Sequence, residues 1–328
     1  MITKILQKSN STLIKNQIRL FSQSLPLYRV ENVMILGSGL MGSGIAQSCA
    51  TTGKFDSITL YDVSQDQLNK AQDRIVKSLS KLKERKKINI GTPEETTSRI
   101  TMKTELKPIS EKNLLIIEAV PEVLELKQEI FKELGTKFGS NPSTIFATNT
   151  STLPCRLIHV HLEQKNQFAA LHFFNPVPMM KLVEIARTPE TKADIIDSLR
   201  QFVLDIDHVP VECKDTPGFI VNRLFMRYHS EALALFERGD ASIEDIDTAM
   251  KLGAGYPMGP FELADYVGLD TQLLSRNSFL KHDPSLKSTV QDPKTLKELV
   301  SKGNFGRKTG KGFYNYGKNG EKLSVNVK

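Results

Sequence analysis

Short apolar runs alternate with helix-like segments between residues 33 and 171. The runs lie at residues 33–36, 58–61, 114–117, 144–147 and 168–171. Uninterrupted apolar runs of this length are typical of parallel strands that are buried on both faces. Apolar residues at helical spacing separate several of them, for example over residues 65–87 and 124–138. Because strands and helices alternate in this way, the pattern predicts an α/β domain with a Rossmann-type, doubly wound parallel sheet.

The pattern changes after Asp215-Thr216-Pro217-Gly218, and only helices are predicted beyond this turn. They cover residues 219–238, 261–266 and 293–302, and Ser242 with Asp245 resembles a capping box that begins a further helix. No alternation typical of strands is found there. We therefore predict an all-α C-terminal domain for substrate binding and dimerisation, residues 214–328, after a nucleotide-binding domain of residues 29–213. A chain of 328 residues suits two such domains.

The first 28 residues differ in composition from the rest of the chain. They are rich in Ser, Thr, Asn and Gln, they carry four basic side chains up to Arg19, and the first acidic residue is Glu31. A basic, acid-free leader with apolar residues at helical spacing is typical of a mitochondrial transit peptide. Residues 1–28 are thus predicted to be a transit peptide and leader, and the protein is expected in the mitochondrial matrix.

The charge and cysteine content exclude several classes of protein. Loss of residues 1–21 would lower the net charge from +7 to about +3, so the basic composition is weak evidence for nucleic-acid binding. No apolar run approaches the roughly 20 residues that a membrane span needs. Cys49, Cys155 and Cys213 are too far apart for a zinc motif or a disulfide framework. Cys49 lies in an apolar helical stretch and is interpreted as a core residue.

A glycine-rich turn follows the first apolar run. Gly37-Ser38-Gly39-Leu40-Met41-Gly42 stands between a predicted strand and a predicted helix, which is the context that a dinucleotide-binding fingerprint requires. Gly37 allows the tight turn, Gly39 lets the backbone approach a pyrophosphate, and Gly42 lets the helix pack on the strand. The N–H groups at the start of the helix then face the phosphates.

The second apolar run ends at Asp62, twenty residues after Gly42. An acidic residue at this distance is typical of the group that binds the adenosine ribose hydroxyls. Its negative charge would repel a 2′-phosphate. The sequence therefore predicts NAD rather than NADP as the cofactor.

The segment from residue 65 to residue 87 ends in a basic cluster. Lysine and arginine follow one another closely from Lys77 to Lys87. Two interpretations remain open from the spacing alone, a solvated helix face or a surface that binds the anionic tail of a ligand.

A histidine and a glutamate flank a turn that contains two prolines. If the runs on either side of Pro178 pair as antiparallel strands, His172 lies opposite Glu184, and opposed positions share a face of the sheet. A histidine backed by a carboxylate is a general-base arrangement, as the oxidation of an alcohol requires. A histidine in an apolar run can also be a core residue, but the opposed glutamate and the upstream nucleotide site favour catalysis. No second His or Cys stands at metal-ligand spacing.

The chain resembles the 3-hydroxyacyl-CoA dehydrogenase family over almost everything after the leader, most closely its single-function mitochondrial short-chain members. The segments that carry the resemblance are residues 37–42, Glu118-Ala-Val-Pro-Glu122, Asn149-Thr-Ser151, His172-Phe-Phe-Asn-Pro-Val-Pro178, residues 214–223, residues 253–261 and Lys308-Thr-Gly-Lys-Gly-Phe313. The resemblance implies NAD-dependent oxidation of (S)-3-hydroxyacyl-CoA to 3-oxoacyl-CoA in fatty acid beta-oxidation. It also implies a homodimer formed through the helical domain.

The resemblance also implies roles for individual residues. His172 would be the catalytic base with Glu184 as its partner, and Ser151 and Asn222 would hydrogen-bond the substrate. The positions that match family residues near NAD are Glu122, Lys127, Ser151, Asn175 and Lys308, in addition to residues 37–42 and Asp62. Ser78 and Arg85, together with Ser151, fall where the family contacts CoA, which favours the ligand-binding interpretation of the basic helix. Arg85 replaces a lysine of the family pattern, so its charge is kept but its geometry can differ.

Two other functions compete with this interpretation. A dehydrogenase that acts on a free 3-hydroxyacid would share the glycine turn and a helical second domain, but such enzymes generally use a lysine as the base. A non-catalytic, crystallin-like NAD-binding protein could share the whole fold, because fold alone does not determine function. The presence of His172, Glu184, Ser151 and Asn222 together argues against both.

Overall fold

The structure is a computed structural model that describes residues 28–84, 92–107, 112–288 and 290–327. The predicted leader, except for Tyr28, and the predicted CoA contact Arg85 lie outside the described residues.

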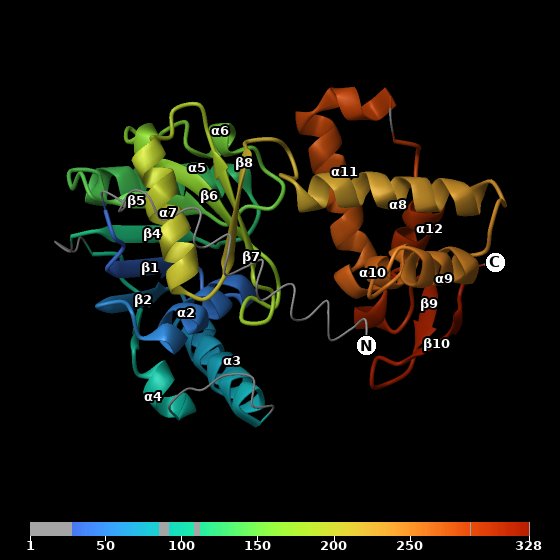
Figure 1. Ribbon diagram of the computed structural model, residues 1–328, viewed down its shortest axis with the longest axis horizontal. Coiled ribbons are helices and arrows are strands. Elements are labelled where there is room, and N and C mark those ends of the chain that lie inside the picture. Colours follow the sequence, from blue (N-terminus) through green and yellow to red (C-terminus); the bar gives the residue numbers. More distant parts are fainter. Residues whose placement is uncertain (1–27, 85–91, 108–111, 289, 328) are drawn as a thin grey trace.

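The first part of the described chain forms an eight-stranded sheet with helices on both faces (Figure 1). The strands are β1 Asn32–Leu36, β2 Ser57–Tyr61, β3 Ile100–Lys103, β4 Leu114–Glu118, β5 Ile145–Thr148, β6 Phe168–Phe173, β7 Leu182–Arg187 and β8 Val209–Lys214. The helices are α2 Leu40–Thr52, α3 Gln65–Glu84, α4 Pro93–Thr97, α5 Leu124–Phe138, α6 Cys155–Ile158 and α7 Ala193–Asp205, with the 3-10 turn η1 Lys165–Gln167. The strand order is β3-β2-β1-β4-β5-β6-β7-β8, and β6–β7 is the antiparallel pair. The predicted doubly wound sheet is confirmed.

Strand β1 shows why these runs are apolar throughout. Val33 and Ile35 pack on one face of the sheet with α2, α3 and α7. Met34 and Leu36 pack on the other face with α5 and α6. Successive side chains of a strand point to opposite faces, and both faces of this sheet are covered, so every position of the strand is buried. Cys49 is fully buried in the first of these cores, as predicted.

The carboxyl ends of the central strands meet at one edge of the sheet. Strands β1, β4, β5 and β6 are parallel neighbours in that order. The glycine turn, the loop that follows Glu118, the loop that carries Ser151, and His172 therefore gather at this edge. Ligands of open α/β sheets bind at the carboxyl ends of the strands.

The second part of the chain is mainly helical and lies beside the sheet domain (Figure 1). Its elements are α8 Val221–Glu237, α9 Ile243–Gly253, α10 Pro260–Val267, α11 Leu269–His282, α12 Lys294–Ser301, the 3-10 turns η2 Pro284–Ser288 and η3 Arg307–Thr309, and the strands β9 Tyr314–Tyr316 and β10 Lys322–Val325. The Ser242 side chain caps α9 by accepting a hydrogen bond from the Asp245 N–H group, as predicted. Within the described residues, no helix is both long and apolar enough to cross a membrane.

The prediction of an all-α second domain needs one correction, because β9 and β10 form a two-stranded antiparallel sheet. Strand β9 has three residues, too few for alternation to be recognised in the sequence. The hairpin depends on a distant residue, Asp265 of α10. Its carboxylate accepts hydrogen bonds from the N–H groups of Phe313 and Tyr314 and from the Tyr316 hydroxyl, each at 2.9 Å. A tertiary contact thus forms this sheet.

Asp265 also explains a glycine in the C-terminal motif. A Cβ atom on Gly312 would lie 2.0 Å from the Asp265 Oδ1 atom, so only glycine allows the hairpin to approach the carboxylate. Burial raises the pKa of Asp265 to about 6, although its three hydrogen bonds act in the opposite direction. The segment from Lys308 to Phe313 therefore has a structural role in this domain.

Candidate active site

The glycine turn has the geometry that its sequence predicts. Gly37 adopts a φ of 96°, and a Cβ atom on Gly42 would lie 1.8 Å from the Gly37 carbonyl oxygen. A Cβ atom on Gly39 would meet no protein atom within 4 Å. Protein packing therefore explains glycine at positions 37 and 42, whereas Gly39 leaves open space over the turn. This space, at the start of α2, suits the close approach of a dinucleotide pyrophosphate.

Asp62 follows β2 and lies beside the same turn. Its carboxylate accepts hydrogen bonds from the Ser38 N–H group at 2.9 Å, the Ser38 hydroxyl at 2.8 Å and the Ser64 N–H group at 3.0 Å. Partial burial raises the pKa of Asp62, but these donors outweigh it and the pKa lies below its ordinary value. A negative charge is thus held next to the glycine turn, where it suits ribose hydroxyls and opposes a 2′-phosphate.

Arg74 of α3 is a residue of this region that the sequence did not indicate. Its guanidinium group donates a hydrogen bond to the Ser38 carbonyl and contacts the Ser43 hydroxyl at 3.4 Å. It therefore connects α3 to the glycine turn and to the start of α2. The sequence held one signal for Arg74, because it directly precedes Ile75, which belongs to the buried apolar face of α3.

His172 and Glu184 form the pair that their distance from Pro178 predicts. They are directly opposed in the β6–β7 register, and His172 Nδ1 lies 2.7 Å from Glu184 Oε2. Both side chains are buried. A carboxylate at Nδ1 keeps the proton on that nitrogen and leaves Nε2 as the basic atom. No hydrogen bond to Nε2 is found among the described residues, so this atom is available to accept a proton.

Glu184 also holds the two domains together. Its Oε1 atom accepts hydrogen bonds from the N–H groups of Ile220, at 3.1 Å, and Val221, at 2.9 Å. These groups lie at the start of α8, where unpaired backbone donors favour a carboxylate. Asn222 is the next residue of α8, so the carboxylate that contacts His172 also contacts the backbone directly before Asn222.

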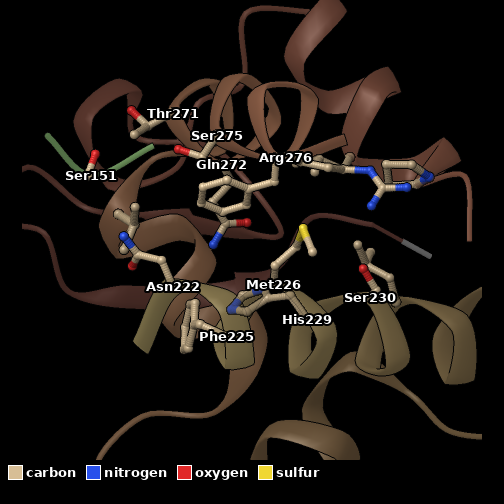
Figure 2. A pocket seen from close by; sticks show the side chains of 15 residues that line it. Ser151, Asn222, Phe225, Met226, His229, Ser230, Thr271, Gln272, Ser275 and Arg276 are labelled. Carbon is tan, nitrogen blue, oxygen red and sulfur yellow. The ribbon is translucent and has the colours of Figure 1, made fainter. Parts of the chain in front are cut away.

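Asn222 and Ser151 meet at a cavity of about 250 Å³ (Figure 2). Ser151 comes from the sheet domain, and the other lining residues come from α8, α10 and α11 and from residues at the start of α12. The structure therefore brings together the two residues that were predicted to bind the substrate. His172 is not among the lining residues, but Phe219, two residues before Val221, packs on its ring with centroids 5.5 Å apart.

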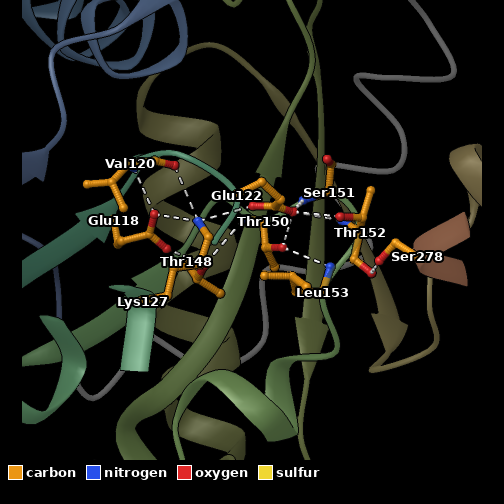
Figure 3. A network of polar contacts seen from close by, with 10 residues as sticks. All are labelled: Glu118, Val120, Glu122, Lys127, Thr148, Thr150, Ser151, Thr152, Leu153 and Ser278. Atoms are coloured by element: carbon orange, nitrogen blue, oxygen red, sulfur yellow. Dashed lines mark hydrogen bonds and ion pairs between the residues drawn. The ribbon is translucent and has the colours of Figure 1, made fainter. Parts of the chain in front are cut away.

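A buried charge network positions the loop that carries Ser151 (Figure 3). Lys127 of α5 has a side chain that is 1% exposed, and its Nζ atom lies 2.6 Å from Glu118 Oε1 and 3.1 Å from Glu122 Oε2. Thr148 donates a hydrogen bond to the other oxygen of Glu118 at 2.7 Å. Each buried charge has a partner of opposite sign, which is the condition for burying it. Glu118 thus joins Glu122 and Lys127, which were each predicted to lie near NAD, in one network.

Glu122 links this network to the loop that carries Ser151. Its Oε1 atom accepts hydrogen bonds from the Thr150 hydroxyl at 2.5 Å and from the Ser151 and Thr152 N–H groups, each at 3.0 Å. Burial raises the pKa of Glu122, but Lys127 and these donors lower it below its ordinary value. The carboxylate thus stays charged and fixes the backbone around Ser151.

The remaining predicted residues are more dispersed. Asn175 is exposed in the turn after β6, and Ser78 is half-buried on α3. Lys308 lies in the helical domain, where its Nζ atom forms an ion pair with Asp270 at 2.6 Å. Their contacts with NAD or CoA therefore stay predictions. Among the described residues, no group of three or more His, Cys, Asp and Glu side chains could hold a metal ion.

Comparison with known proteins identifies the family of the chain. The model of the 3-hydroxyacyl-CoA dehydrogenase NAD binding domain matches residues 32–216, and that of the 3-hydroxyacyl-CoA dehydrogenase C-terminal domain matches residues 218–316. The chain belongs to the 3-hydroxyacyl-CoA dehydrogenase family. The predicted NAD cofactor and the predicted dehydrogenase class are thereby confirmed, as is the resemblance found in the sequence.

Individual relatives agree with the family. The chain is 47% identical over 293 residues to human mitochondrial hydroxyacyl-coenzyme A dehydrogenase. This alignment covers 88% of the chain and 91% of the human relative. It is 43% identical over 304 residues to a probable 3-hydroxyacyl-CoA dehydrogenase of Caenorhabditis elegans. This alignment covers 91% of the chain and 97% of the relative. The crystal structure of (S)-3-hydroxybutyryl-CoA dehydrogenase from Ralstonia eutropha superposes with a TM-score of 0.80 at 33% identity, covering 88% of this chain and all of that chain.

Proposed function

We propose that this enzyme oxidises (S)-3-hydroxyacyl-CoA to 3-oxoacyl-CoA with His172 as the general base and Glu184 as its partner. The observation that carries the proposal is the buried His172–Glu184 pair, 2.7 Å apart, at the carboxyl edge of a sheet whose first turn suits a dinucleotide. The same edge holds Ser151, and α8 brings Asn222 to it. An alcohol oxidation needs a base and a nucleotide at one place, and this edge provides both.

The proton transfer follows from the hydrogen bonds of the pair. Nε2 of His172 accepts the proton of the 3-hydroxyl group, and Glu184 stabilises the imidazolium that results. Bound NAD⁺ supplies the acceptor for the hydride of C3. Ser151 and Asn222 hydrogen-bond the substrate and keep its hydroxyl group toward the base. Because a proton is released in oxidation, reduction of 3-oxoacyl-CoA is favoured at lower pH.

The cofactor and CoA contacts complete the proposal. Residues 37–42 bind the pyrophosphate and Asp62 binds the adenosine ribose, a role that the open space over Gly39 and the negative charge of Asp62 support. The residues proposed to lie near NAD are Glu122, Lys127, Ser151, Asn175 and Lys308, and those proposed to contact CoA are Ser78, Arg85 and Ser151.

The domain boundary, the location and the assembly belong to the same proposal. We place the nucleotide-binding domain at residues 29–213 and the helical domain at residues 214–328. A mitochondrial matrix enzyme agrees with the basic leader and with the mitochondrial relatives. A homodimer through the helical domain would cover apolar side chains that are exposed there, among them Leu224, Leu252 and Leu274.

The test compares wild-type protein with the His172→Asn variant, both without residues 1–21, in the reduction of acetoacetyl-CoA by NADH. The wild type should consume NADH rapidly, but not NADPH, and should not act on free acetoacetate. The variant should lose about 10²- to 10⁴-fold in turnover, the usual contribution of a general base, while NADH binding is unchanged. Near-normal turnover in the variant refutes the role of His172. Reaction with free acetoacetate would indicate a free-acid dehydrogenase instead.

A further inference from the structure

The cavity that begins at Ser151 and Asn222 extends between α8 and α11 beyond the proposed reaction centre (Figure 2). Its walls contain a set of apolar side chains, Phe225, Met226, Leu233, Val267, Phe279, Pro293 and Leu296. Such walls suit an acyl chain. The remaining lining residues include polar side chains that a simple hydrocarbon tail would not require.

Arg276 of α11 is the most unusual of these residues. It is only 8% exposed. One terminal nitrogen, Nη2, donates a hydrogen bond to the Gln291 carbonyl at 2.5 Å, whereas Nη1 is buried without a hydrogen-bond partner among the described residues. The nearby negative charge of Asp292 favours the charged form of Arg276. The Asp292 carboxylate, however, forms its ion pair with Lys297 and not with Arg276. A buried cation without an anionic partner is costly, so an anion at this place would stabilise it.

Two further unpaired groups line the same cavity. Among the described residues, the Nε2 atom of Gln272 and the Nε2 atom of His229 are also buried without hydrogen-bond partners. Figure 2 shows the Gln272 amide directed into the space between α8 and α11, with the His229 ring on the opposite side. Burial lowers the pKa of His229 to about 3, so its ring is neutral and adds no second charge. Buried polar groups usually have partners, and here a ligand with acceptor oxygens would provide them.

We infer that this cavity binds the acyl chain of the substrate and that Arg276 binds a carboxylate at its far end, so that the enzyme accepts 3-hydroxyacyl-CoA thioesters of dicarboxylic acids. The inference rests on the proposed function, because Ser151 and Asn222 at the cavity entrance define where the reacting carbon lies. The apolar walls of the cavity contact the methylene groups that lie between the reacting carbon and the terminal carboxylate. The single positive charge then pairs with a single negative charge, and Gln272 or His229 can donate to the second carboxylate oxygen.

The test compares two CoA thioesters of equal chain length that end differently, (S)-3-hydroxyhexanoyl-CoA and the corresponding thioester of 3-hydroxyadipic acid. The enzymes are the wild type, Arg276→Met, and Arg227→Met as a matched control on an exposed position of α8. For Arg276→Met, kcat/KM for the carboxylate substrate should fall about 10- to 100-fold, the effect of one charge-assisted hydrogen-bonded pair, with little change for the methyl-ended substrate. Arg227→Met should change neither value.

A structural role for Arg276 would give a different result. If Arg276 served only the fold, through its hydrogen bond to the Gln291 carbonyl, Arg276→Met would lower the thermal stability and would lower kcat/KM equally for both substrates. The inference is overturned if Arg276→Met lowers kcat/KM equally for both substrates, so that the ratio of the two kcat/KM values is unchanged. Arg276→Lys keeps the charge and should retain more of the preference than Arg276→Met if an anion is bound. Oxidation of 3-hydroxybutyryl-CoA by the wild type separates the two proposals. If the wild type does not oxidise this substrate, the proposed function is refuted. If only the inference about Arg276 is wrong, the wild type still oxidises it.

Discussion

Replacing Glu184 by glutamine tests the proposed catalytic role of the His172–Glu184 pair without changing the size of the side chain at position 184. In the wild type, one carboxylate oxygen accepts from His172 Nδ1 and the other from the N–H groups of Ile220 and Val221. A glutamine has one acceptor oxygen and one NH₂ donor, so it cannot satisfy both sides. One of the two sets of contacts must therefore change.

The structure determines which side the amide oxygen takes. If the NH₂ group faced the start of α8, two buried backbone donors would lose their acceptor, at a cost of about 1–3 kcal/mol each. The oxygen therefore stays with Ile220 and Val221, and the NH₂ group faces His172 Nδ1. The imidazole proton must then move to Nε2, the atom that we propose accepts the substrate proton. We expect turnover to fall by about 10²- to 10⁴-fold, the contribution of a general base.

The assay measures NADH consumption with acetoacetyl-CoA for the wild type, Glu184→Gln and Glu212→Gln. Glu212 lies on the neighbouring strand β8 and pairs with Arg187 and Arg200 at the surface, so it is the matched control. Nitrogen NMR of the labelled ring should show the proton of His172 on Nε2 in the Glu184 variant. Turnover equal to that of the control, or a change in thermal stability alone, would refute the reasoning.

Two further predictions concern buried charges away from His172. Lys127→Met should lower the free energy of unfolding by about 3–5 kcal/mol, because it leaves the buried Glu118 carboxylate without its partner, whereas Lys132→Met on the exposed face of α5 should have little effect in urea unfolding. An equal decrease in the free energy of unfolding for Lys127→Met and Lys132→Met would contradict the stabilising role of the Glu118–Lys127 ion pair. The raised pKa of Asp265 means that the folded state binds its proton more tightly, so this contribution to stability is complete below pH 3.8 and is lost as the pH rises through about 6. The stability of the wild type relative to Asp265→Asn should therefore fall by on the order of 3 kcal/mol between pH 4 and pH 7, and a difference that does not vary with pH would exclude this account.

Local patterns in the sequence were sufficient for the central strands of the sheet, although not for β3 and β8, and for the contact between His172 and Glu184. The strand, the turn and the helix around Gly37 lie within a short segment, and Gly37 and Gly42 each have a steric reason that follows from backbone geometry. His172 and Glu184 are close in sequence, and the pairing of two strands about one turn places them opposite each other. The alternation of side chains along a strand made this contact predictable.

Only the tertiary structure decided what surrounds these elements. Ser151 and Asn222 were identified by resemblance, but their meeting at one cavity depends on the packing of α8 and α11 against the sheet domain. Arg276 gives no signal in the sequence, because an arginine on a helix is usually solvated. Its burial, with Nη1 unpaired among the described residues, arises only in the folded chain, where Nη2 donates to the Gln291 carbonyl. Local spacing determines which side chains share a strand or a turn, whereas the burial and the partner of a charge depend on segments that are distant in sequence and meet only in the folded chain.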